Sequence, residues 1–267
     1  MEPRRAPRLT VTLGMHGSAS TWVFNVVREL LASELGTGRV ASGYAEDARQ
    51  LLDGNGLEGK NIVVKCHRIG RSLSMILWLS RAPMFISIRD PRDAMLSMMQ
   101  RFHLSFEEAI SMLEKDIKHI VDYADSGHPI FRYEDNFTED HSSIKSIAQS
   151  LGISSRESRL RDIFSKYSAR SVMEFGAHLA DLPEDRLVRT PHDVFDKITH
   201  IHAAHIGDRR VGKWRDLLGR EERETANRRF NFFLRHFGYD SARDPAMDDP
   251  LMQGRTNRSE LPVDSRP

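Results

Sequence analysis

Short apolar runs rich in β-branched residues alternate along this chain with longer segments of helical periodicity. Three such runs, at 8–14, 61–66 and 84–88, are typical of buried parallel strands, and a weaker fourth lies at 129–133. Alternating strands and helices form βαβ units, in which the strands pair in parallel and the helices cover both faces of the sheet. The sequence therefore predicts an α/β fold with three layers, α/β/α, around a central parallel sheet. The expected helices span residues 20–35, 72–80, 106–124 and 142–152.

The periodic pattern indicates one domain. A length of 267 residues suits one large domain or two small ones, and no internal repeat is visible. We expect the domain to span residues 8–239, after a flexible N-terminus at 1–7. From residue 240 onward Pro, Asp, Arg and Ser dominate and the periodicity stops. Residues 240–267 are therefore predicted to be a disordered tail.

Charge and cysteine content exclude some classes of protein. A formal net charge of +1 argues against a general nucleic-acid binder, so we expect no nucleic-acid partner. The single cysteine, Cys66, allows no internal disulfide. The first ten residues have no apolar core for a signal peptide, and no uninterrupted apolar run of 18 residues follows. We expect a soluble, cytoplasmic protein without a membrane span.

Polar segments follow each of the four expected strands. They are residues 14–21, 65–68, 89–93 and 133–135, and three of them carry cationic side chains. In open parallel sheets, ligands bind beyond the carboxyl ends of the strands. Because parallel strands end at the same edge of the sheet, these segments are expected to meet there. The sequence thus predicts an anionic ligand at this edge.

The first of these segments, GMHGSASTWVFN at 14–25, has the pattern of a strand, a Gly/Ser turn and a helix. Backbone N–H groups at such a turn, with the dipole of the helix behind them, favour an anion. The turn lacks the lysine of the Walker pattern GxxxxGK[ST], however. Capping of the helix alone explains Ser18, Ser20 and Thr21 equally well.

The third segment, RDPRDAMLS at 89–97, combines a helix start with an unexplained arginine. Asp90 is suited to the N-cap, Pro91 to the first helical position, and Asp93 to the positive end of the helix dipole. None of these requirements explains Arg89 at the end of a strand. A guanidinium at that position can bind a phosphate through two N–H groups.

Residues 86–98 resemble the R-x-P-x-D-x-x-x-S motif of the cytosolic-type sulfotransferases, which use 3′-phosphoadenylyl sulfate (PAPS). The resemblance implies that Arg89 and Ser97 hold the 3′-phosphate of the nucleotide. GSASTW at 17–22 is similar to the end of the family motif PKSGTTW, which forms a P-loop-like phosphosulfate-binding loop. Gly17 stands where the family has lysine. The implied contacts of this loop are Gly17, Ser18, Ala19, Ser20, Thr21 and Trp22.

The segment VVKCH at 63–67 resembles the family's KTH motif at a strand end, with Cys66 in place of Thr. This resemblance implies that Lys65 contacts the transferring sulfuryl group or its leaving oxygen, and that His67 is the base for the acceptor's proton. Taken alone, a histidine at a strand end is more often structural. The matching neighbours favour the catalytic role.

Three further segments resemble parts of the nucleotide site. FRYEDNF at 131–137 is similar to the family's YED, which implies that Tyr133 lies against the nucleotide, and YSARSVM at 167–173 implies a contact of Ser168 on the adenine side. HIGDRRVGKWRD at 205–216 resembles R-K-G-x-x-G-D-W, although its first part is two residues longer. His205 stands where the arginine falls, so either Arg209 or Arg210 supplies the charge. The implied contacts here are Arg209, Arg210, Gly212 and Lys213.

The resemblance implies a sulfotransferase domain over residues 8–239. Such an enzyme moves the sulfuryl group of PAPS directly, in line, to a hydroxyl of a small-molecule or glycan acceptor and releases PAP, with no metal expected. His16 adds charge beside the loop near neutral pH. Two alternatives stay open: a P-loop kinase-like phosphotransferase, which needs a Walker lysine and magnesium, and a non-catalytic relative that binds PAP or PAPS, suggested by Gly17. The acceptor and the oligomeric state cannot be derived from the sequence.

Overall fold

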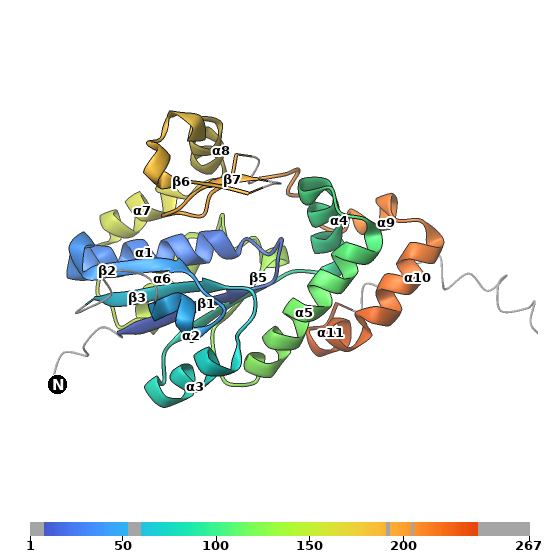
Figure 1. The fold of residues 1–267 in the computed structure, drawn as a ribbon, viewed down its shortest axis with the longest axis horizontal. Helices are drawn as coiled ribbons and strands as arrows, with labels where there is room; N and C mark the ends of the chain where they lie inside the picture. The colour runs from blue at the N-terminus through green and yellow to red at the C-terminus, as the bar shows by residue number, and fades with distance from the viewer. Residues whose placement is uncertain (1–7, 53–59, 191–192, 204–205, 240–267) are drawn as a thin grey trace, which may run out of the picture.

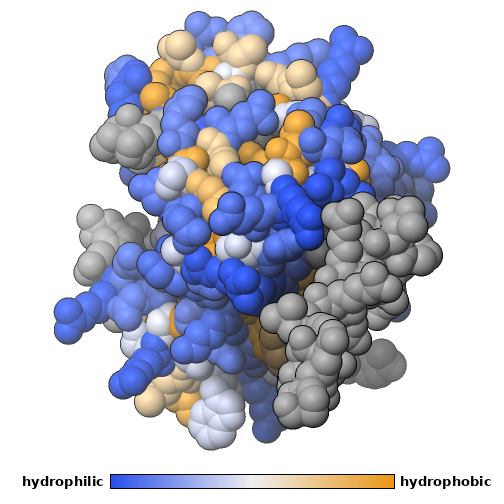
Figure 2. Space-filling model, turned by 90° about the vertical axis from the view of Figure 1, so that its right-hand side faces the viewer, coloured by the Kyte–Doolittle hydropathy of each residue, from blue (hydrophilic) through white to orange (hydrophobic). Residues whose placement is uncertain are grey.

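The computed structural model of the chain describes residues 8–52, 60–190, 193–203 and 206–239. The predicted N-terminus at 1–7, the predicted tail at 240–267 and His205 therefore lie outside the described residues. In the described part no helix is both long and apolar enough to cross a membrane. The face drawn in Figure 2 is largely hydrophilic, with its apolar residues in small groups between polar ones.

A five-stranded sheet forms the centre of the structure, in the order β2-β3-β1-β4-β5, and every neighbouring pair is parallel (Figure 1). This confirms the predicted parallel sheet and its four expected strands. The sequence did not indicate β2, because VASGY has no apolar run and its residues are only half-buried at the sheet edge. The strands are β1 (Leu9–Gly14), β2 (Val40–Tyr44), β3 (Asn61–Cys66), β4 (Met84–Ile88) and β5 (Ile130–Arg132).

Helices cover both faces of the sheet, as predicted. Successive side chains of a strand point to opposite faces, so Val63 packs in one apolar cluster and Val64 in the other. The first cluster lies under α1 (Ser20–Leu35), with α6 and α7 behind it (Figure 1). The second lies between the sheet and α3, α4, α5, α10 and α11. Their bounds are α3 Arg71–Ser80, α4 Pro91–Phe102, α5 Phe106–Ala124, α6 His141–Ser150, α7 Glu157–Lys166, α10 Arg220–Arg229 and α11 Asn231–His236.

Local chemistry fixes where the two helices beside the site begin. The Asp90 carboxylate accepts the N–H of Arg92 at 3.0 Å, and Pro91 takes the first position of α4. This is the predicted N-cap. A capping box between Ser105 and Glu108 starts α5. The starts of α4 and α5 are thus both fixed by side-chain caps.

Shorter elements complete the chain. An antiparallel pair, β6 and β7, lies with α8 above α1 in Figure 1. Backbone carbonyls that follow β7 attach this unit to α1: Asn25 donates to the carbonyl of Thr199 at 2.7 Å. These elements are α2 (Ala48–Leu52), α8 (Ala169–Ala177), β6 (Leu187–Arg189), β7 (Val194–Asp196), α9 (Trp214–Leu217) and the single turns η1 (Thr37–Arg39), η2 (Tyr133–Asp135), η3 (Leu179–Asp181) and η4 (Glu184–Arg186).

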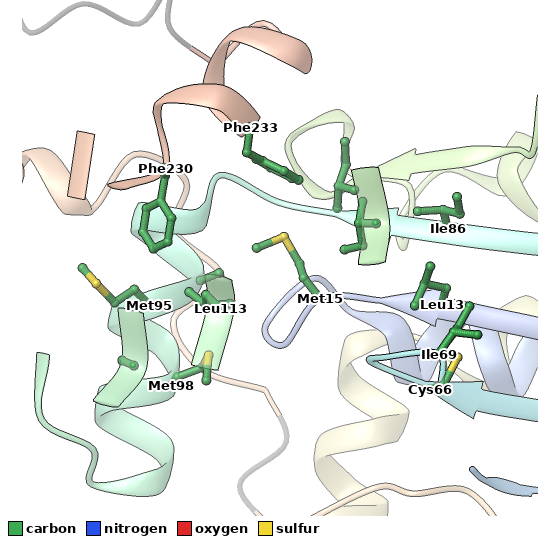
Figure 3. Close-up of a cluster of buried hydrophobic side chains, with 14 of the residues drawn as sticks. Leu13, Met15, Cys66, Ile69, Ile86, Met95, Met98, Leu113, Phe230 and Phe233 are labelled. Carbon is green, nitrogen blue, oxygen red and sulfur yellow. The ribbon is translucent and has the colours of Figure 1, made fainter. Parts of the chain in front are cut away.

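Met15, the first residue after β1, joins the end of the sheet to the helices. Its side chain is fully buried in the second cluster, near Leu113 and Phe233 (Figure 3). Its sulfur also accepts the backbone N–H of Arg89 at 3.2 Å. The start of the 15–19 turn is therefore held against the end of β4.

Candidate functional site

The carboxyl ends of the three central strands lie side by side. Leu13 of β1 pairs with Cys66 of β3 and with Ile86 of β4. The segments that follow these strands meet around a cavity of about 790 Å³. This confirms that the polar strand ends converge, at the place where open parallel sheets bind ligands.

Twelve of the sixteen residues predicted from the sequence line this cavity, and four do not. The twelve are Gly17, Ala19, Ser20, Thr21, Trp22, Lys65, His67, Arg89, Ser97, Tyr133, Arg209 and Lys213.

The other four have structural contacts instead. Ser18 is buried under the turn and donates to the carbonyl of Met15 at 2.7 Å. Ser168 is the N-cap of α8. The side chain of Arg210 pairs with an exposed carboxylate at 2.9 Å, and the N–H of Gly212 donates to the Asp93 carboxylate at 2.5 Å.

The turn between β1 and α1 requires glycine at position 17. Gly17 has a φ of +77°, and a Cβ there would lie 3.3 Å from the Cα of Ala94 on α4. A lysine at this position is therefore strained in its backbone and crowded against α4. The packing of the turn thus fits glycine, and not lysine, at position 17.

The N-terminus of α1 is open to the cavity. Ala19 stands at the N-cap in a left-handed conformation, and no side chain of the described residues caps the helix. The capping interpretation of Ser18, Ser20 and Thr21 is therefore wrong. Ser20 and Thr21 line the cavity at the positive end of a 16-residue helix, an arrangement suited to an anion.

Arg89 connects three segments of the site. Its guanidinium donates to the carbonyl of Gly17 at 3.2 Å, to the hydroxyl of Ser97 at 3.3 Å and to the carbonyl of Arg210 at 2.9 Å. It also lies 4.1 Å from the centre of the Tyr133 ring. The buried Nε atom has no partner among the described residues.

Lys65 is a buried cation at the end of β3. Its side chain lines the cavity, and it has no ion-pair partner among the residues that the structure describes. Burial, together with the positive charge of Arg101, lowers the pKa of Lys65 from 10.5 to about 8. Near neutral pH the protonated ammonium is therefore available to an anion in the cavity.

His67 is held as a neutral imidazole. Its Nδ1 atom is hydrogen-bonded to the carbonyl of Gly14, so Nδ1 carries the proton and Nε2 keeps its lone pair. Burial, with the neighbouring His16 and Lys65, lowers the pKa of His67 well below 6.5. The ring also lines the cavity, so it has the geometry of a proton acceptor.

A second histidine stacks on His67. The ring centres of His16 and His67 are 3.6 Å apart, and the Nδ1 of His16 lies 2.5 Å from a carboxylate oxygen of Asp116. Within the described ranges these three residues form a group that could hold a metal ion, with one ligand atom each within 4.8 Å. Hydrogen bonds already use both Nδ1 atoms, however, and stacked rings do not converge on one point.

The segment 206–216 closes one side of the cavity. The Asp93 carboxylate accepts the N–H groups of Gly212 and Trp214, at 2.5 and 3.0 Å, and so attaches the segment to α4. Arg209 and Lys213 line the cavity, and they are paired with Glu139 at 2.7 Å and Asp208 at 3.2 Å. Of the two arginines left open by the sequence, only Arg209 faces the cavity among the described residues.

Comparisons with known proteins identify the fold. No family model matches the sequence, and no curated protein matches it. Solved structures do match over most of the chain. Retinol dehydratase in complex with androsterone and inactive cofactor PAP has a TM-score of 0.60 at 16% identity, and covers 87% of this chain and 82% of its own. This chain has the cytosolic-type sulfotransferase fold.

Two further matches agree. Retinol dehydratase in a complex with retinol and PAP gives a TM-score of 0.59 at 15% identity, with coverage of 87% and 82%. Mouse sulfotransferase SULT7A1 complexed with PAP gives 0.60 at 13% identity, covering 86% of each chain. The sulfotransferase fold thus accounts for nearly all of the described residues, and the predicted resemblance is confirmed at the level of the fold.

Beyond the motifs, the cavity of this sulfotransferase fold has an aromatic and histidine-rich side. From His67 a series of ring contacts runs through Tyr44 at 5.8 Å and His200 at 6.5 Å to Phe195 at 5.6 Å. Burial, with a smaller effect of the Lys65 charge, lowers the pKa of His200 to about 3. The sequence did not indicate these residues, since β2 and the segment 194–202 carry no motif.

Proposed function

We propose that this chain is a PAPS-dependent sulfotransferase that transfers a sulfuryl group to a hydroxyl of a small-molecule or glycan acceptor in the cytoplasm. One observation carries the proposal: the N-terminus of α1, the buried cation of Lys65 and the neutral base His67 open on one cavity. The first two features bind an anion, and the third accepts a proton. Sulfuryl transfer to a hydroxyl needs a site for the anionic donor and an acceptor for the proton of the hydroxyl.

The nucleotide is held on the α4 side of the cavity. Arg89 and Ser97 bind its 3′-phosphate, while Arg209 and Lys213 supply further charge at the rim. Tyr133 lies under the Arg89 guanidinium, where it can also stack on the nucleotide. The turn at 17–22 then receives the 5′-phosphosulfate. The solved structures with this fold were obtained with PAP, which supports the choice of nucleotide.

Transfer proceeds in one displacement. The acceptor oxygen forms a bond to sulfur while the bond between sulfur and the bridging phosphate oxygen breaks, and the electron pair of that bond stays on PAP. The acceptor's proton moves to Nε2 of His67, whose Nδ1–H stays bonded to the carbonyl of Gly14. Lys65 and the N–H groups at the start of α1 stabilise the charge that grows on the leaving phosphate.

The acceptor occupies the aromatic side of the cavity. The two retinol dehydratase structures hold androsterone or retinol, which supports a small hydroxyl-bearing molecule. In this chain the base is bordered by Tyr44, His200 and Phe195. These side chains provide both ring surfaces and polar groups for the acceptor.

Nucleotide preference tests the proposal. Calorimetry should show that PAP binds more tightly than adenosine 5′-phosphate by roughly 10–150-fold, the value of a charge-assisted hydrogen bond. Arg89→Ala should remove most of this preference. Arg210→Ala is the matched control, because its side chain pairs with Asp216 and does not line the cavity. Equal affinity of the wild-type protein for the two nucleotides would contradict the proposed function.

A further inference from the structure

A fully buried carboxylate, Asp116 of α5, lies beneath the start of the phosphate-binding turn. Its Oδ2 atom accepts the backbone N–H of His16 at 3.0 Å and lies 2.5 Å from the His16 ring, while Oδ1 has no hydrogen-bond partner among the described residues. A buried carboxylate is costly unless it is hydrogen-bonded and its charge is compensated. The Asp116–His16 pair therefore needs a positive charge within it or directly beside it.

Arg68 is the other cationic group near this carboxylate. Its Nε lies 3.8 Å from Asp116, outside hydrogen-bonding range, and 3.3 Å from Glu46, so its charge is shared. Lys65 and Arg101 add positive charge around the cavity from β3 and α4. The short contact is the one to His16, at 2.5 Å, and hydrogen bonds between a cationic donor and a carboxylate are shorter than neutral ones.

The hydrogen-bond partners of the two stacked rings favour different charges on His16 and His67. Because Nδ1 of His16 faces Asp116, Nε2 is the nitrogen left to donate to a ligand, and the ring lines the cavity. His67 faces a neutral carbonyl and is more deeply buried. One positive charge placed on the stack is therefore favoured on His16, and this charge keeps His67 neutral and able to accept a proton.

We propose that His16, protonated and held by Asp116, is the cation of the phosphate-binding turn that Gly17 cannot supply. In the complex its Nε2–H donates to the phosphate that carries the sulfuryl group, and it stabilises the charge left there after transfer. Asp116 is the positioning residue that keeps the proton on His16. This inference rests on the proposed function, since it names the ligand of that same site.

Proton uptake on nucleotide binding measures this role without turnover. The uptake is the difference between the number of protons on the His16 ring in the PAP complex and in the free protein. Calorimetric titrations with PAP at pH 6.5, in buffers of different ionisation enthalpy, give this number. The phosphates of PAP also titrate, and they do so with both proteins. The proton uptake due to His16 is therefore the uptake of the wild-type protein minus that of His16→Gln.

Three variants separate charge from structure. His16→Gln should weaken PAP binding by roughly 10–150-fold and lose the proton uptake. His16→Lys supplies a permanent cation, so it should bind PAP more tightly than His16→Gln with no proton uptake. Asp116→Asn keeps the shape of the side chain but removes the charge that holds the proton on His16, so it should weaken PAP binding in the same direction as His16→Gln. His119→Gln, on the same helix but outside the cavity, is the matched control and should behave as wild type.

The outcomes distinguish this inference from the proposed function. PAP binding with the same affinity in wild type and His16→Gln would overturn the role of His16 and leave the function intact. Equal losses of affinity in His16→Gln and His16→Lys would also overturn it, because the charge would then be irrelevant. Stoichiometric metal in the purified protein that is lost in His16→Gln would assign the cluster to a metal instead. If the wild-type protein does not bind PAP, the function itself is wrong.

Discussion

Replacing Lys65 with methionine should stabilise the free protein and weaken nucleotide binding. Methionine retains the apolar stem and removes the charge, which is buried without an ion-pair partner among the described residues. The pKa of Lys65 is lowered from 10.5 to about 8. At about 1.4 kcal/mol per pH unit, this difference corresponds to a penalty of about 3 kcal/mol on the folded state.

The sign of the pH dependence follows from the direction of the shift. Below about pH 8, Lys65 is protonated in the folded and the unfolded chain, so the whole penalty is present. Between about 8 and 10.5 the folded chain loses its proton first, and the penalty decreases. Urea unfolding should therefore find Lys65→Met more stable than wild type by about 3 kcal/mol at pH 7, with the two nearly equal at pH 10.5.

Nucleotide binding should change in the opposite direction. The anion in the cavity compensates the Lys65 charge, so Lys65→Met should lose roughly 10–150-fold in affinity for PAP near neutral pH. In the wild-type protein this affinity should decrease as the pH rises through about 8, and in Lys65→Met that decrease should be absent. A variant that is less stable than wild type at pH 7 would refute the reasoning, because the lysine would then be favourably paired.

Four further predictions concern single features. Asp93→Asn should destabilise the 206–216 segment and lower PAP affinity about tenfold, as measured by calorimetry, because its carboxylate accepts two backbone N–H groups. Gly17→Lys should lower the melting temperature rather than restore a phosphate-binding lysine, because φ is +77° there. His67→Ala should lower kcat about 10²–10⁴-fold, with partial rescue by acceptors of low hydroxyl pKa in a steady-state series. Truncation after Tyr239 tests the predicted tail and should leave the melting temperature and PAP affinity nearly unchanged.

The strand ends could be predicted from the sequence because their geometry is simple. Lys65 lies at the end of an apolar β-branched run, His67 and Arg89 directly follow such runs, and parallel strands end at one edge. Their convergence on one cavity needed no knowledge of the helices. The sheet itself was predictable for the same reason, apart from β2, whose small and polar residues carry no strand signal.

The partners from distant helices could not be predicted. Asp116 is separated from His16 by 100 residues. Its spacing from Leu113 and Ile120 places it on the buried face of α5, but no local pattern shows that this face packs against the end of β1 beside His16. Likewise, no sequence pattern indicates that Arg209 adopts a left-handed backbone, with a φ of 59°. This backbone helps to decide which of Arg209 and Arg210 faces the cavity, so the choice between them required the structure.

Sulfuryl transfer from PAPS labelled at sulfur tests the central claim most directly. The purified chain is incubated with labelled PAPS and a broad panel of phenols, alcohols, steroids and glycans, and the products are identified by mass spectrometry. The account predicts at least one acceptor that gains one sulfuryl group, with PAP formed in equal amount and the label absent from the protein. His67→Ala should strongly reduce this product. Tight PAP binding without transfer to any acceptor would indicate a non-catalytic nucleotide-binding protein, and transfer of a phosphoryl group from ATP instead would contradict the assignment.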